Sequence, residues 1–177
     1  LPSLKDIKIR NLQFFTLYLP LGFIFFGLIY LSIPYFFNYE KNYIKKIICT
    51  KNNIICDIEG SIKYSFFPTP RVNIKNLQIK DPFNKEKIFL KANNVVVKIQ
   101  TNDLLKKNKQ VYKKIEFIDY QTVINLDNIK KYKNFTYEEK NLLPINFFNG
   151  KIDFVSNGSI VFTLNNTDVD LISANNL

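Results

Sequence analysis

Few side chains in this sequence have the types and spacing that catalysis needs. Histidine is absent from all 177 residues, so the commonest acid–base group and the commonest metal ligand are both missing. Asp57 and Glu59 fall on one side of an extended strand, where two carboxylates could act as a pair. Lys63 shares that side, which favours the simpler interpretation of a solvated charged surface.

The serines and cysteines give no stronger signal. Ser61 and Ser65 have no obvious base near them in the sequence, and no glycine-rich phosphate loop is present. Cys49 and Cys56 lack the second pair that a zinc site requires. They form either one disulfide in an oxidising compartment or two small buried side chains. We therefore expect no enzymatic activity, no metal and no cofactor.

The charge of the chain is strongly basic. There are 25 Lys and Arg residues against 15 Asp and Glu, which gives a net charge of +10. Such a charge can attract nucleic acid or anionic lipid, although a Lys-rich composition explains it equally well. The lysines are scattered, and arginine occurs only at Arg10 and Arg71. Phosphate and base recognition usually relies more on arginine, so we expect no nucleic-acid partner.

An uncharged segment near the start predicts a transmembrane helix over Phe14–Phe37, "FFTLYLPLGFIFFGLIYLSIPYFF". As a helix it is about 36 Å long, enough for a hydrocarbon core of about 30 Å. Tyrosines lie towards its ends, where the membrane interface favours them. A cleaved signal peptide is the alternative, but its apolar region is only about 7–15 residues long. Ser32-Ile33-Pro34 also makes a poor cleavage site, so we predict an uncleaved anchor.

The orientation of this helix is less obvious from the charges. Three basic residues lie on each side: Lys5, Lys8 and Arg10 before it, and Lys41, Lys45 and Lys46 after it. Short basic tails tend to stay in the cytoplasm, whereas long domains are translocated regardless of charge. We therefore expect residues 1–13 to be a cytoplasmic tail and the chain from Asn38 onward to lie outside the cytoplasm.

After the helix, the hydrophobic period changes twice. Residues 38–51 place Tyr39, Tyr43 and Ile47 at helical spacing, which predicts a short juxtamembrane helix. From Ile54 the period is two, which predicts a strand that Gly60 interrupts. Pro68 and Pro70 end this strand because proline cannot donate to a ladder.

Alternation continues beyond that corner. The apolar rows change phase at Lys75-Asn76 and at Asn93-Asn94, which exchanges faces unless a bulge absorbs the slip. No strong amphipathic helix separates the strands, and Asp127–Leu142 is polar enough for a long loop. This pattern excludes a βαβ architecture and favours an antiparallel sheet. The further strand candidates are Ile88–Ala92, Val95–Ile99, Lys114–Ile118, Thr122–Leu126, Lys151–Val155, Ile160–Leu164 and Val169–Ile172.

The fold class that we expect is mainly β. Because the sequence contains no Met and stops within an Asn-rich segment, we interpret it as a fragment of a longer chain. In this interpretation, residues 52–177 are an incomplete β domain that follows the membrane helix and the juxtamembrane helix.

The order of several short motifs resembles the N-terminal region of the AsmA family of bacterial envelope proteins. In that family, a Gly-x-apolar strand leads to a Pro-x-Pro corner, followed by strands with an Asn, an Ala, a Leu-Leu step and an Asn-Gly pair. The segments that carry the resemblance are "EGSIKYSFFPTPRVNIKNLQI", "KANNVVVKIQTNDLL", "YKKIEFIDYQTVINLDN" and "INFFNGKIDF". The matching residues are Gly60, Pro68, Pro70, Asn76, Ala92, Leu104-Leu105 and Asn149-Gly150.

This resemblance implies a lipid-transfer protein anchored in the bacterial inner membrane. Its periplasmic sheet would curl into an apolar β-groove that moves phospholipid toward the outer membrane and supports outer-membrane biogenesis. Its partners would be phospholipid, the inner membrane and outer-membrane or other envelope proteins. The corner formed by Gly60, Pro68 and Pro70 would redirect the chain so that the sheet curls, whereas a compact sandwich would use the same corner as a plain hairpin.

Alternation supplies the candidate groove residues: Ile58, Ile62, Tyr64, Val72, Ile74, Val95, Val97, Ile99 and Phe117. Two other functions stay open. One is a non-enzymatic scaffold of the cell envelope, whose sheet packs a closed core. The other is an exported hydrolase whose site lies beyond this sequence.

Overall fold

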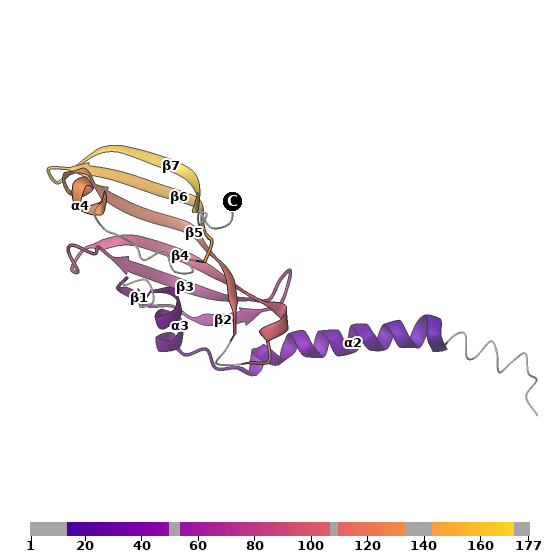
Figure 1. Ribbon diagram of the computed structural model, residues 1–177. Coiled ribbons are helices and arrows are strands. Elements are labelled where there is room, and N and C mark those ends of the chain that lie inside the picture. The colour runs from indigo at the N-terminus through magenta and orange to yellow at the C-terminus, as the bar shows by residue number, and fades with distance from the viewer. Residues whose placement is uncertain (1–13, 50–53, 107–109, 134–142, 172–177) are drawn as a thin grey trace, which may run out of the picture.

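The chain forms a long apolar helix that projects from one end of a curved, unclosed sheet (Figure 1). The computed structural model describes residues 14–49, 54–106, 110–133 and 143–171. The predicted cytoplasmic tail, residues 1–13, lies outside the described residues.

The apolar helix has three consecutive parts, η1 (Phe14–Tyr18), α2 (Leu19–Ser32) and η2 (Ile33–Phe36). Pro20 and Pro34 lie near the starts of α2 and η2, where one type of helix passes into the next. Residues Phe15–Phe36 are long and apolar enough to cross a membrane, and no residue of α2 is buried. The structure confirms the apolar helix that the sequence predicts.

The juxtamembrane helix and the first two strands also form where the sequence predicts them. Helix α3 (Lys41–Ile48) buries Ile44 and Ile48, which are one helical turn apart. Strands β1 (Cys56–Ile58) and β2 (Ile62–Ser65) pair one after the other with β3 (Arg71–Lys80).

Gly60 separates β1 from β2 because the backbone of β3 passes very close to it. A Cβ atom at Gly60 would lie 2.4 Å from the carbonyl oxygen of Lys75, which is too close for any other residue type without movement of the backbone. The interruption is therefore a close backbone approach.

The proline corner connects β2 to β3. The Phe67–Pro68 peptide bond is cis, and the guanidinium of Arg71 donates to the carbonyl of Phe67. The carbonyl of Pro70 accepts a hydrogen bond of 2.9 Å from the amide of Ile99. The corner is thus joined to the end of β4, the strand that neighbours β3.

The remaining strands are longer than predicted. They are β4 (Ile88–Ile99), β5 (Tyr112–Asn125), β6 (Ile145–Ser156) and β7 (Ser159–Leu171). In the described parts of their connections there are three short helical segments, η4 (Thr101–Asp103), η5 (Leu126–Asn128) and α4 (Ile129–Lys133). The sheet order is β1-β3-β4-β5-β6-β7, and β2 also pairs with β3.

The prediction of a fully antiparallel sheet is wrong at one position. Strands β5 and β6 are parallel, with Ile115 opposite Ile145 and Asn125 opposite Val155. A parallel connection needs about a dozen residues or more, and residues 126–144 are enough for one. The segment predicted as a loop, Asp127–Leu142, begins with η5 and α4, and residues 134–142 lie outside the described residues.

One row of left-handed residues crosses the sheet. Asn76, Asp119, Asn149 and Asn166 have φ values of 51°, 53°, 54° and 52° and lie in β3, β5, β6 and β7. The register of β4 places Asn93 in the same row, since its neighbours Ala92 and Asn94 lie opposite Leu77 and Lys75. Asn and Asp adopt this conformation more readily than other L residues.

The left-handed row keeps the apolar side chains on one face. In β3, Val72 and Ile74 precede Asn76, Leu77 follows it, and all three apolar residues are fully buried. In β5, Phe117 and Tyr120 are both buried on either side of Asp119. The phase change predicted at Lys75-Asn76 therefore does not move the apolar side chains to the other face, because the left-handed backbone at Asn76 compensates for it. Because neighbouring strands slip at the same position, the β3–β4, β4–β5 and β5–β6 ladders stay in register there, whereas the β6–β7 register shifts around Gly150.

Candidate functional site

The candidate site is the apolar face of the sheet, the face that α3 covers at one end. Beneath α3 this face is a closed core. Ile44 and Ile48 of α3 belong to the same buried cluster as Val72 and Ile74 of β3 and Val95 of β4. This part of the sheet offers no open apolar surface.

Across β5, β6 and β7, the same face is progressively uncovered in the part of the chain that the structure describes. Ile124 lies opposite Phe154, and Phe154 lies opposite Phe162 with the two rings stacked at 4.1 Å. Ile152 lies opposite Leu164. We define these five residues as the open apolar patch: Ile124, Ile152, Phe154, Phe162 and Leu164.

The patch is continuous with the core but exposed at its outer edge. Phe147 of β6 stacks on the buried Phe117 at 4.9 Å and thereby links the two regions. Phe162 and Leu164, in the last strand of the sheet, are 47% and 43% exposed. Figure 1 shows β6 and β7 at the end of the sheet farthest from α3. The apolar face therefore runs from a closed core to an exposed edge.

The nine groove candidates lie in the closed part of this face. Ile62 is half-buried, and the other eight are between 0% and 6% exposed. Eight of them belong to the buried cluster and Ile62 packs against it, so a lipid tail cannot reach them in this structure. The alternation of apolar and polar residues predicted that these side chains share one face of the sheet, but it did not predict the order of the strands. The exposed residues of β7 were therefore missed, although Ile160–Leu164 was predicted as a strand.

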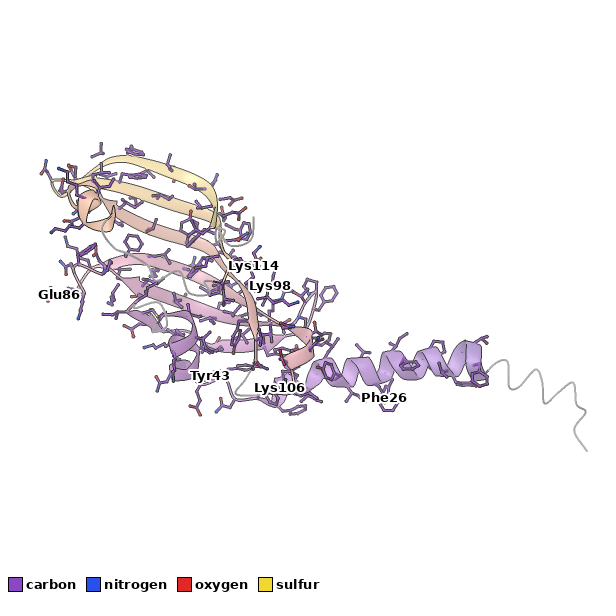
Figure 2. The ribbon with its side chains drawn as sticks, viewed as in Figure 1. Phe26, Tyr43, Glu86, Lys98, Lys106 and Lys114 are labelled. Carbon is purple, nitrogen blue, oxygen red and sulfur yellow. A yellow bond between two sulfur atoms is a disulfide. The ribbon has the colours of Figure 1, made fainter. Side chains whose placement is uncertain are left out.

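The opposite face of the sheet is polar and ion-paired. Glu116 of β5 binds Lys98 of β4 at 2.7 Å and Lys114 at 3.3 Å, and Figure 2 shows these two lysines close together. Burial raises the pKa of Glu116, but the hydrogen bonds from both lysines outweigh it and hold the pKa below its usual value. Asp153 of β6 likewise accepts bonds from Thr163 and Lys151 at 2.6 and 2.9 Å.

A polar hollow of about 360 Å³ lies on this second face, along the left-handed row. Its lining includes Lys91, Asn93, Gln121, Lys151 and Asn165. Most of its side chains are exposed, and the left-handed backbone by itself accounts for several of its Asn and Asp residues. The types of its lining residues therefore do not by themselves indicate a binding site.

Asp57 and Glu59, for which the sequence favours a charged surface over a catalytic pair, take part in contacts that hold α3 against the sheet. Asp57 forms an ion pair with Lys45 of α3 at 2.6 Å, and that hydrogen bond lowers the pKa of Asp57. Lys41 donates to the backbone carbonyls of Ile58 and Glu59. These contacts attach α3 to β1. In the described ranges, no three His, Cys, Asp or Glu side chains gather as metal ligands.

The two cysteines form a disulfide. Cys49, at the end of α3, is bonded to Cys56 in β1, and their Cα atoms are 6.1 Å apart. Both residues belong to the buried cluster. Of the two alternatives that the sequence allows, the structure contains the cross-link, which fixes α3 over the closed part of the apolar face.

Comparison with known proteins gives no match to this chain among protein-family models, curated proteins or solved structures.

Proposed function

We propose that this protein is anchored in the bacterial inner membrane and moves phospholipid through the periplasm toward the outer membrane, along its apolar β face. The observation that carries this proposal is the open apolar patch, which continues the closed core to the exposed edge of the sheet. The resemblance of the motifs at Gly60, Pro68 and Asn149-Gly150 to the AsmA family points to the same function.

The chemistry of the patch suits an acyl chain. Each CH₂ group removed from water contributes about 0.8 kcal/mol. An acyl chain lying on Phe162 and Leu164 would shield these side chains while its headgroup stayed in water. Such binding depends on apolar contact alone, so the proposal requires no catalytic residue, metal or cofactor.

Two further observations support the proposed location. The helix Phe15–Phe36 is long and apolar enough to anchor the chain in a membrane. The Cys49–Cys56 disulfide is typical of an oxidising compartment such as the periplasm. Together they favour a single-pass protein whose sheet lies on the periplasmic side.

A second function is favoured by the closed core beneath α3. A non-enzymatic scaffold of the cell envelope would also pack most of its apolar face against itself. In that case, the open apolar patch would contact another envelope protein instead of a lipid.

Transfer of a fluorescent phospholipid between two vesicle populations separates these functions. The full chain is reconstituted in donor vesicles, and the rate of lipid appearance in acceptor vesicles is measured. We expect the wild type to accelerate transfer and Phe162→Glu to abolish most of the acceleration, because a carboxylate would then lie in the patch. Asn165→Glu, on the polar face of the same strand, is the matched control and should retain the wild-type rate. Equal rates for Phe162→Glu and Asn165→Glu would contradict lipid transfer along this patch.

A further inference from the structure

The end of the sheet from which α2 projects is bonded directly to the apolar helix. The hydroxyl of Tyr30 in α2 donates to the carbonyl of Thr101 in the β4–β5 connection at 2.7 Å. The hydroxyl of Tyr64 in β2 donates to the carbonyl of Leu31 at 2.9 Å. The ring of Tyr35 also packs on Tyr64, with a centroid distance of 5.3 Å. The helix and this end of the sheet therefore have a fixed relative position.

These contacts determine where the β4–β5 connection lies along the length of the apolar span. Tyr30 lies six residues before Phe36, the last residue of the span, which is about 9 Å along a helix. The whole span of 22 residues is about 33 Å long, close to the thickness of a hydrocarbon core. Thr101 is bonded to a residue inside the span. This end of the sheet is therefore held close to the end of the span that Phe36 closes, which places it near the lipid headgroups when the helix crosses a bilayer.

The side chains exposed at this end suit that environment. Phe67, in the proline corner, is 77% exposed, and Leu105, in the β4–β5 connection, is 51% exposed. Val111, just before β5, is also exposed. Lys106 extends beside them and is bonded to Asp103 at 2.7 Å. Figure 2 shows Lys106 where the helix meets the sheet. Aromatic, aliphatic and basic residues together are typical of a membrane interface.

We propose that this membrane-proximal rim, formed by Phe67, Leu105, Lys106 and Val111, lies on the bilayer that the helix crosses. Phe67 and Leu105 enter the headgroup region. The ammonium group of Lys106 donates one hydrogen bond to Asp103, and its other N–H groups bind lipid phosphate. This inference rests on the proposed function only in requiring the helix to span a membrane. Its consequence is a sheet held in one orientation relative to the membrane that the helix crosses.

The absence of tryptophan from the sequence permits a direct test with single-tryptophan variants. The full chain carrying Phe67→Trp or Leu105→Trp is reconstituted in phosphatidylcholine–phosphatidylglycerol vesicles, with and without brominated acyl chains. Phe83→Trp is the matched control, because Phe83 is an exposed residue of the β3–β4 turn. Figure 2 places Glu86 of the same turn at the end of the domain far from the helix.

We expect blue-shifted emission and loss of intensity in brominated vesicles for Phe67→Trp and Leu105→Trp, with neither change for Phe83→Trp. Adding Lys106→Gln to Phe67→Trp should weaken the quenching in anionic vesicles and leave it unchanged in pure phosphatidylcholine. The rim contact alone would be overturned if carbonate does not extract the protein and the two rim variants are quenched no more than Phe83→Trp. Extraction of the protein by carbonate would overturn both this inference and the proposed anchor.

Discussion

The ring of Tyr120 in β5 lies directly over Gly150 in β6. A Cβ atom at Gly150 would be 1.9 Å from Cε1 of Tyr120, so no larger residue fits while the ring stays in place. The hydroxyl of Tyr120 continues across β6 and donates to the carbonyl of Thr167 in β7 at 3.3 Å. One tyrosine thus contacts both strands that carry the exposed part of the apolar face.

Replacing Gly150 should therefore destabilise the outer strands. We expect Gly150→Ala to displace the Tyr120 ring and lower the free energy of unfolding by about 1–3 kcal/mol, the usual cost of overpacking. Urea unfolding of the detergent-solubilised full chain measures this change. Gly22→Ala is the control, because nothing lies within 4 Å of its added methyl group. Equal stability of the two variants would show that the ring moves without cost.

The left-handed row makes a second prediction, at Asn76. We expect Asn76→Val to cost about 1–2 kcal/mol, because a branched residue is strained at a φ of 51°. Asn76→Gly should be tolerated, since glycine adopts this conformation freely. Asn73→Val, three residues earlier in β3, is the control and should change stability little. A comparable loss for Asn73→Val would mean that strand packing, and not φ, determines the result.

The same row shows what could be predicted from the sequence. The slip at Lys75-Asn76 was visible because apolar residues flank it on both sides. At Asn93-Asn94 the sequence suggested a break between two strands, yet β4 runs through it without interruption. Considered alone, a pair of Asn residues predicts a turn. Here the neighbouring strands β3 and β5 have left-handed residues at the same position, and that alignment depends on a strand order that one sequence does not contain.

The parallel pair and the open apolar patch were missed for the same reason. The polar segment after Asn125 gave no helical period, so nothing indicated that the chain returns to the start of β6 alongside β5. Phe162 was recognised as part of a strand, but its exposure follows from the place of β7 at the edge of the sheet. Local features such as the apolar helix, Gly60 and the proline corner were predictable because each depends on a few adjacent residues.

The ion pairs of Glu116 should make the free energy of unfolding depend on pH in the acidic range. Its folded pKa is lower than its usual value of 4.5, so its ion pairs with Lys98 and Lys114 contribute stability above that value. This contribution should be lost as the pH falls below 4.5 and through the folded pKa. We expect Glu116→Gln to flatten that part of the stability–pH curve, measured by urea unfolding. Glu86→Gln, at an exposed turn, should leave the curve as in the wild type; an unchanged curve for Glu116→Gln would contradict this account.

The disulfide predicts a stability difference that depends on redox state. Removing it with Cys49→Ser and Cys56→Ser together should cost about 2.5 kcal/mol, by the loop-entropy estimate for a short loop. The wild type should show the same loss after reduction, whereas the double variant should not respond to reductant. Thiol labelling of the unreduced, denatured wild type checks that the bond is present. Full labelling without reductant would contradict the cross-link.

Photo-crosslinking in cells tests the central claim, that the open apolar patch carries phospholipid, most directly. Benzoylphenylalanine is incorporated at Phe162 of the full chain and, as the control, at Asn165 on the polar face of the same strand. Adducts are then analysed for phospholipid and for protein. Our account predicts phospholipid adducts at Phe162 and none at Asn165. Protein adducts without phospholipid at Phe162, or equal phospholipid labelling at both positions, would contradict it.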